Sequence, residues 1–142
     1  MKTVNPYLNF PGNTEEAFTF YKSVFGGEFT ALQRFNETPM AKDFSAEDGA
    51  KIMHVRLPLG NGIDLMATDA LESMGQKMVA GNNFSISLQV ESKEEADKLF
   101  NGLSEGGKIE MPIADAFWGS YFGAFTDKFG IQWMVNYEYP KV

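Results

Sequence analysis

His54, the single histidine of the chain, and Asp64 are the residues whose types and spacing first suggest chemistry. A Gly60-Asn61-Gly62 turn separates them, and an apolar, strand-like run flanks the turn on each side. Paired strands would place an imidazole and a carboxylate on one sheet, where they could help to bind Zn, Ni, Fe or Mn. The alternative is a hydrogen-bonded histidine and a solvated aspartate.

Arg56 follows His54 by two residues, so on an extended strand the two side chains share one face with Pro58. Val55 and Leu57 then face the opposite side. A guanidinium can bind a carboxylate or a phosphate through two parallel hydrogen bonds. The alternative for Arg56 is a solvated surface charge.

The second half of the chain supplies aromatic candidates. Trp118 and Gly119 open a loop before a strand that contains Tyr121. An indole ring with backbone amides nearby suits the wall of a small-molecule cavity, although most aromatic side chains must be buried in the core. We therefore expect a cavity lined by some of His54, Arg56, Trp118 and Tyr121, which would prefer a small anionic or aromatic ligand. Catalytic residues stay unassigned.

Composition narrows the classes of function. The chain has 142 residues, about one domain, and no cysteine, which excludes disulfides, thiolate zinc sites and iron–sulfur clusters. A formal charge of −7 disfavours nucleic acid and anionic membranes as partners. No apolar run reaches the length of a transmembrane helix or a signal peptide, so we expect a cytoplasmic protein.

A helix signal occurs twice, with a shift of 79 residues. Asn13 is followed three residues later by Glu16, and Ser92 by Glu95, as in a capping box. Apolar residues at helical spacing follow each box, and a Gly-Gly pair ends each pattern. The repeat predicts helices near residues 14–25 and 93–104.

One strand-like segment precedes each predicted helix and three follow it. The chain thus reads as α+β, a single domain over 1–142 made of two βαβββ modules, about 4–70 and 83–139. The polar region 36–50 reads as a long loop. The connector after residue 70 is compatible with a helix up to Val79.

Three segments carry a family resemblance: "YLNFPGNTEEAFTFYKSVFGGE", "MHVRLPLGNGIDLMATD" and "FWGSYFGAFTDKFGIQWMVN". With the two modules, they resemble the vicinal oxygen chelate superfamily of glyoxalase I, extradiol dioxygenases and bleomycin-resistance proteins, and within it the PhnB-like branch. The likeness covers about residues 5 to 138. It implies curved mixed sheets that pair into a site-bearing cavity, often within a dimer, so we expect a homodimer. It does not imply one reaction.

Members of this branch often carry the label 3-demethylubiquinone-9 3-methyltransferase. A nucleotide-type cofactor needs a Gly-rich turn that leads from a strand into a helix. The Gly60-Asn61-Gly62 turn leads into another strand instead, so we expect no such cofactor.

The resemblance also implies four metal-ligand positions, a histidine on the first strand of each module and a glutamate on the last. In this sequence they fall on Pro6 or Tyr7, Asp64, near Ser85, and Met134. Only Asp64 is a competent ligand. We therefore expect no catalytic metal, a hydrogen-bonded His54, and an Asp64 that pairs with a cation or water.

Three functions stay open. The first is a small-molecule-binding protein without a catalytic metal, which the ligand count favours. The second is a metal-dependent lyase, isomerase or dioxygenase that uses Asp64 and further partners. The third is an interaction module with a vestigial cavity.

Overall fold

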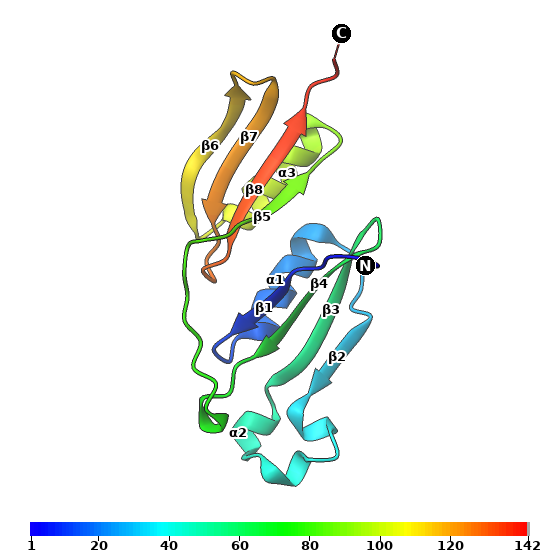
Figure 1. Cartoon of the computed structure of the whole chain (residues 1–142), viewed down its shortest axis with the longest axis vertical. Coiled ribbons are helices and arrows are strands. Elements are labelled where there is room, and N and C mark those ends of the chain that lie inside the picture. The colour runs from blue at the N-terminus through cyan, green and yellow to red at the C-terminus, as the bar shows by residue number, and fades with distance from the viewer. Residues whose placement is uncertain (142) are drawn as a thin grey trace. The chain divides into compact units, whose positions relative to one another are not determined.

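The computed structural model describes residues 1–141 and has an α+β architecture. The chain forms two compact units, Met1–Val79 and Ala80–Val142. In each unit one long helix lies against one face of a four-stranded mixed sheet (Figure 1). The two predicted βαβββ modules are therefore confirmed. None of the helices within residues 1–141 is long and apolar enough to cross a membrane.

Unit 1 contains β1 (Tyr7–Phe10), α1 (Thr14–Phe25), β2 (Ala31–Arg34), β3 (Ile52–Gly60) and β4 (Ile63–Asp69). Its strands lie in the order β1-β4-β3-β2. Strand β1 runs parallel to β4, whereas β3 is antiparallel to both of its neighbours. The β3–β4 hairpin closes at the predicted turn, where Asn61 and Gly62 both have positive φ.

Unit 2 contains β5 (Ile86–Gln89), α3 (Lys93–Ser104), β6 (Lys108–Ala116), β7 (Ser120–Thr126) and β8 (Gln132–Glu138). The strand order β5-β8-β7-β6 repeats that of unit 1, with β5 parallel to β8. Both long helices have the bounds that the repeat predicted.

Each core lies between the helix and its sheet. The buried residues of α1 are Thr14, Ala17, Phe18 and Tyr21, and those of α3 are Ala96, Leu99, Phe100 and Leu103. Both sets recur every three or four residues and so form one stripe along the helix. The stripes place the long helices on one face of their sheets and leave the other face uncovered by helix.

The start of α1 differs from the prediction. Asn13 occupies the N-cap position, but its side chain makes no capping hydrogen bond. Instead Asp69, the last residue of β4 and only 2% exposed, takes that role. Its Oδ1 accepts the N–H of Gly12 at 3.1 Å, the N–H of Thr14 at 3.0 Å and the Thr14 hydroxyl at 2.6 Å. A carboxylate is a stronger acceptor than an amide and is favoured at the positive end of a helix.

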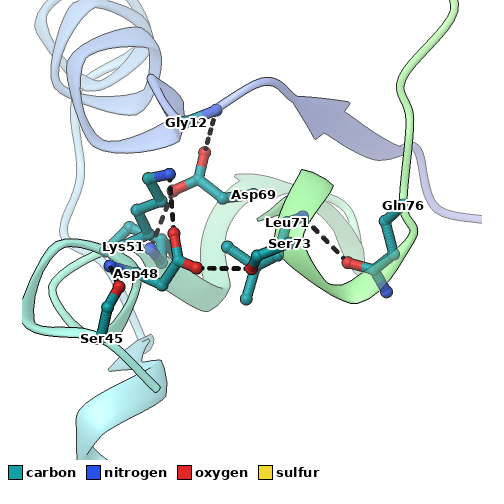
Figure 2. A network of polar contacts seen from close by, with 9 residues as sticks. Gly12, Ser45, Asp48, Lys51, Asp69, Leu71, Ser73 and Gln76 are labelled. Atoms are coloured by element: carbon teal, nitrogen blue, oxygen red, sulfur yellow. Dashed lines mark hydrogen bonds and ion pairs between the residues drawn. The ribbon is translucent and has the colours of Figure 1, made fainter.

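The other oxygen of Asp69 reaches a third element. Its Oδ2 accepts the N–H of Ile52, the first residue of β3, at 2.8 Å. One buried carboxylate therefore joins the β1–α1 connection, the end of β4 and the start of β3. Figure 2 shows Asp69 beside Gly12 and the neighbouring polar residues.

By contrast, α3 begins largely as predicted. The Ser92 hydroxyl accepts the N–H of Glu95 at 3.0 Å. The Glu95 carboxylate accepts the N–H of Glu91 at 2.9 Å, one residue before the N-cap.

Residues 36–50 are more ordered than the predicted loop. They contain most of the 3-10 turn η1 (Phe35–Glu37), then η2 (Ala41–Asp43) and the short helix α2 (Ala46–Gly49). Asp48 anchors the segment, since its carboxylate accepts from Lys51 Nζ at 3.0 Å and from the Ser73 hydroxyl at 2.5 Å (Figure 2). A hydrogen bond from Ser73, 25 residues away, thus helps to order a segment that the sequence pattern predicts as a loop.

The connector prediction is wrong. The 3-10 turn η3 (Glu72–Met74) ends at Gly75, which has a left-handed backbone. Residues 76 to 85 form neither helix nor strand. The Gln76 side chain accepts the N–H of Leu71 at 3.0 Å and so folds back over the turn (Figure 2).

The hydrogen bonds of Asp69 predict that Asp69→Asn is strongly destabilising. The new NH₂ group cannot accept an N–H, so buried donors lose their partners, at a cost on the order of 2–4 kcal/mol in the free energy of unfolding. Urea unfolding followed by far-ultraviolet circular dichroism measures this change. Asp43→Asn, an exposed change in the same unit, is the control. Equal midpoints for the two variants would contradict the role of Asp69.

Candidate functional site

The uncovered face of the unit 1 sheet carries the polar candidates. Tyr7 on β1 lies opposite Met66 on β4, and Met66 lies opposite Arg56 on β3. Cross-strand partners share a face, as do residues two apart on a strand, so His54 lies on this face as well. The side chains on the opposite face pack toward α1 and are buried: Leu8, Val55, Leu57, Leu65 and Ala67. The predicted alternation of β3 is confirmed.

His54 is paired with Tyr7. The Tyr7 hydroxyl lies 3.1 Å from His54 Nδ1, and the two rings stack with centroids 5.8 Å apart. Partial burial raises the pKa of the Tyr7 phenol, so the hydroxyl keeps its proton at neutral pH and can donate to an unprotonated Nδ1. The expected hydrogen-bonded histidine is confirmed. Its Nε2 has no hydrogen-bond partner among residues 1–141.

Arg56 forms an ion pair with Asp64. Its Nε lies 3.8 Å from Asp64 Oδ2, a distance too long for a hydrogen bond. The cation partner expected for Asp64 is therefore observed. The Arg56 side chain is 46% exposed, and its guanidinium makes no hydrogen bond within the described part of the chain.

Arg34, the other arginine of the chain, has the opposite environment. Both of its Nη atoms donate to the Glu15 carboxylate, at 3.0 and 2.7 Å. Nη1 also donates to the Ala50 carbonyl at 2.8 Å. The guanidinium of Arg34 is thus occupied by the protein itself, whereas that of Arg56 makes no hydrogen bond within residues 1–141.

The side chains at the expected metal-ligand positions suit a divalent cation poorly. Tyr7 keeps its proton, Asp64 lies beside the positive charge of Arg56, and Met134 offers only a soft thioether. Among residues 1–141 no three His, Cys, Asp or Glu side chains gather as a metal site would require. The side chains of residues 1–141 therefore do not fit the ligand set of a catalytic metal site.

In unit 2, Trp118 lies on the turn between β6 and β7 and is 53% exposed. Its ring contacts that of Phe122 edge-on, with centroids 5.6 Å apart. A Cβ added to Gly123 would lie 2.6 Å from the ring of Phe100 on α3, so Gly123 is on the face toward α3. Phe122, its neighbour on the strand, points to the opposite face. Phe122 and Trp118 therefore belong to the face away from α3.

Tyr121 lies on the other face of the same sheet. Its hydroxyl donates to Asp97 of α3 at 2.6 Å, and Lys93 Nζ lies 4.6 Å from the centre of its ring. Within unit 2 the structure therefore separates Trp118 from Tyr121. In unit 1 it brings His54 and Arg56 together on one face.

Sequence reasoning treated Tyr7 only as a poor metal ligand. A partial signal was present, because Tyr7 occupies an alternating strand that the βαβββ pattern places beside the last strand of its module. The pattern does not give the register between β1 and β4. The observed register pairs Tyr7 with Met66 and so places Tyr7 close to His54.

Comparison with known proteins identifies the family. A family model described as the glyoxalase/bleomycin resistance protein/dioxygenase superfamily matches residues 3–135. The chain belongs to this superfamily. It is 35% identical to Protein YjdN of Escherichia coli K12 over 141 residues, which are 94% of this chain and 93% of YjdN.

Two solved structures are similar over almost their whole length. Protein PA1353 from Pseudomonas aeruginosa shares 43% identity with a TM-score of 0.84, over 96% of this chain and 97% of PA1353. The PhnB protein from Bacillus cereus, provisionally described as a 3-demethylubiquinone-9 3-methyltransferase, shares 27% identity with a TM-score of 0.70, over 95% of this chain and 98% of PhnB. The PhnB-like resemblance is confirmed.

The Tyr7–His54 pair predicts a response of the single imidazole to Tyr7→Phe. At about pH 8, where an ordinary histidine is neutral, the proton should reside on Nε2 because Nδ1 accepts from Tyr7. Removing the hydroxyl should shift the Nδ1 resonance in a long-range ¹H–¹⁵N spectrum, whereas Tyr137→Phe should not. A proton on Nδ1, unaffected by Tyr7→Phe, would show that the pair is absent.

The position of Tyr121 predicts a late phenol titration. The hydrogen bond to Asp97, followed by desolvation, raises the pKa of Tyr121 to about 12. Ionisation would place a second negative charge beside the carboxylate, so Asp97→Asn should move the pKa back toward 10.0. Tyrosinate absorbance measured against pH tests this, and Tyr121→Phe identifies the component that belongs to Tyr121. A Tyr121 component near 12 that survives Asp97→Asn would place Tyr121 elsewhere.

Proposed function

We propose that this protein binds a small organic molecule without a catalytic metal. The observation that carries the proposal is the group formed by Tyr7, His54 and Arg56 on the uncovered face of the unit 1 sheet. The half-buried Met66 lies among them. A few convergent polar side chains around apolar surface are typical of small-molecule sites.

The aromatic residues of unit 2 support the same function. Trp118 and Phe122 offer flat apolar surface on the face away from α3. Such surface suits an aromatic or hydrophobic part of a ligand. Within unit 2 we propose Trp118 as a ligand-binding residue, as we propose His54 and Arg56 within unit 1, and leave Tyr121 out because its hydroxyl is engaged with Asp97.

The proposal extends to a homodimer in the cytoplasm. Each sheet has one face that its long helix leaves uncovered and two edge strands, which are surfaces that proteins usually protect. Two-fold symmetric dimers are the commonest way to do so.

Native mass spectrometry of the untagged, purified protein tests metal, ligand and oligomer together. We expect a dimer that carries an organic adduct, or accepts one from a panel of small aromatic and carboxylic acids, without stoichiometric metal. Stoichiometric Zn, Ni, Fe or Mn that binds at micromolar affinity and is lost in His54→Ala or Asp64→Ala would support a metal-dependent enzyme instead. A dimer that binds nothing in the panel would support an interaction module.

Tryptophan fluorescence tests whether the ligand contacts Trp118 of unit 2. Trp118 is half exposed, whereas Trp133, the other tryptophan, is fully buried. A ligand that contacts Trp118 should quench emission in the native protein and leave that of Trp118→Phe unchanged. Equal quenching in both proteins would show that the ligand does not contact Trp118.

A further inference from the structure

The uncovered face of unit 1 has hydrogen-bond donors that the protein does not use. Arg56 always carries a positive charge and has five N–H groups. None of them forms a hydrogen bond within residues 1–141. Arg34 shows how this chain satisfies a guanidinium that serves structure, with a bidentate carboxylate and a carbonyl. The contrast indicates that Arg56 is kept free for a group outside the chain.

The Tyr7–His54 pair also presents donors in either charge state of the imidazole. When His54 is neutral with its proton on Nε2, Tyr7 donates to Nδ1 and the Nε2–H is free to donate. When the proton is on Nδ1 instead, that N–H donates to the Tyr7 oxygen and the phenolic hydrogen is free. When His54 is protonated, Nδ1–H donates to the Tyr7 oxygen, so both Nε2–H and the phenolic hydrogen are free. In each of these states the pair keeps at least one free donor for a ligand.

The three side chains are close enough to act on one chemical group. His54 and Arg56 are two residues apart on β3, about 7 Å along an extended strand. Tyr7 lies across Met66 from Arg56 and stacks on His54. A cationic fork and a neighbouring N–H donor over an apolar side chain match an oxyanion attached to an organic group.

Within residues 1–141, Asp64 is the carboxylate that pairs with this cluster. Its Oδ2 lies 3.8 Å from Arg56 Nε and accepts no hydrogen bond from it. The N–H groups of the guanidinium remain available to hold two oxygens of a ligand at once. Asp64 therefore partly neutralises Arg56 and should weaken the binding of an external anion.

From this arrangement, we propose that Tyr7, His54 and Arg56 form an anion-binding face for the carboxylate or phosphate group of the ligand. The inference rests on the proposed function and names the chemical class of the bound group. It also gives the cluster the opposite preference to that of the superfamily's metal site: it binds an anion where a metal site would bind a cation.

Isothermal titration calorimetry with three probes tests the proposal: benzoate, phenyl phosphate and the neutral benzyl alcohol. Both anions should bind more tightly than benzyl alcohol. The tighter of the two identifies carboxylate or phosphate as the preferred group. Arg56→Gln should lower the affinity for the tighter-binding anion by at least about tenfold, as expected when a charge-assisted pair is lost. Arg56→Lys keeps the positive charge but lacks the planar guanidinium. Its affinity for the anion should lie between those of the native protein and Arg56→Gln.

Two further variants separate the site from general charge effects. Lys42→Gln removes an exposed positive charge from the same unit and should leave anion affinity unchanged. Asp64→Asn should strengthen anion binding several-fold, because a competing carboxylate is gone.

Each remaining outcome overturns a distinct statement. Equal losses in Arg56→Gln and Lys42→Gln would mean nonspecific attraction, and weaker anion binding in Asp64→Asn would mean that Asp64 supports the ligand. If benzyl alcohol binds as tightly as the anions, the anion-binding face is refuted while small-molecule binding stands. If none of the probes binds and no adduct is found by mass spectrometry, both proposals fail.

Discussion

The buried carboxylate of Asp69 is the interaction on which unit 1 depends most. Its two oxygens accept from backbone and side-chain donors just before α1, at its first residue and at the start of β3, while Asp69 itself ends β4. A buried charge is tolerated only when hydrogen bonds compensate its desolvation, and here four donors do so. Because Asp69 fixes β4 against β1 and β3, it also fixes the strands that carry Tyr7, His54 and Arg56. The candidate site therefore inherits its geometry from a residue on the opposite face of the sheet.

Unit 2 repeats the scaffold of unit 1 with different polar chemistry. Ser92 caps α3 locally, and the buried aspartate of this unit, Asp127, lies at the β7–β8 turn. Its carboxylate accepts the N–H groups of Phe129 and Ile131 and the indole N–H of Trp133. On the face away from α3, Phe122 lies opposite Asn136, whose amide donates to Gln89 of β5 at 2.8 Å. The repeat therefore preserves the sheet and helix, whereas the side chains on this face differ between the units.

The sequence predicted those parts of the fold that depend on local signals. Capping residues, apolar stripes and glycine turns gave both long helices and the βαβββ order, because each signal spans only a few residues. The connector error is local, because Gly75 has a left-handed backbone and the Gln76 side chain folds back to Leu71. Two other differences involve contacts between distant residues. Asp69 replaces Asn13 as the cap from 55 positions away, and Tyr7 reaches His54 across 47. Strand alternation placed His54 with Arg56 correctly. Residues three apart face opposite sides of an extended strand, so alternation also agrees with the separation of Trp118 from Tyr121, which the expected shared lining did not take into account.

A crystal structure of the protein grown with both manganese chloride and phenyl phosphate tests the central claim most directly, because anomalous scattering identifies manganese and separates it from the phosphate. Our account predicts phosphate oxygens within hydrogen-bond distance of the Arg56 guanidinium and His54 Nε2, and no manganese on this face. Manganese ligated by Tyr7, His54 or Asp64 would contradict it. So would a phosphate bound elsewhere while Arg56 keeps only Asp64 as its partner.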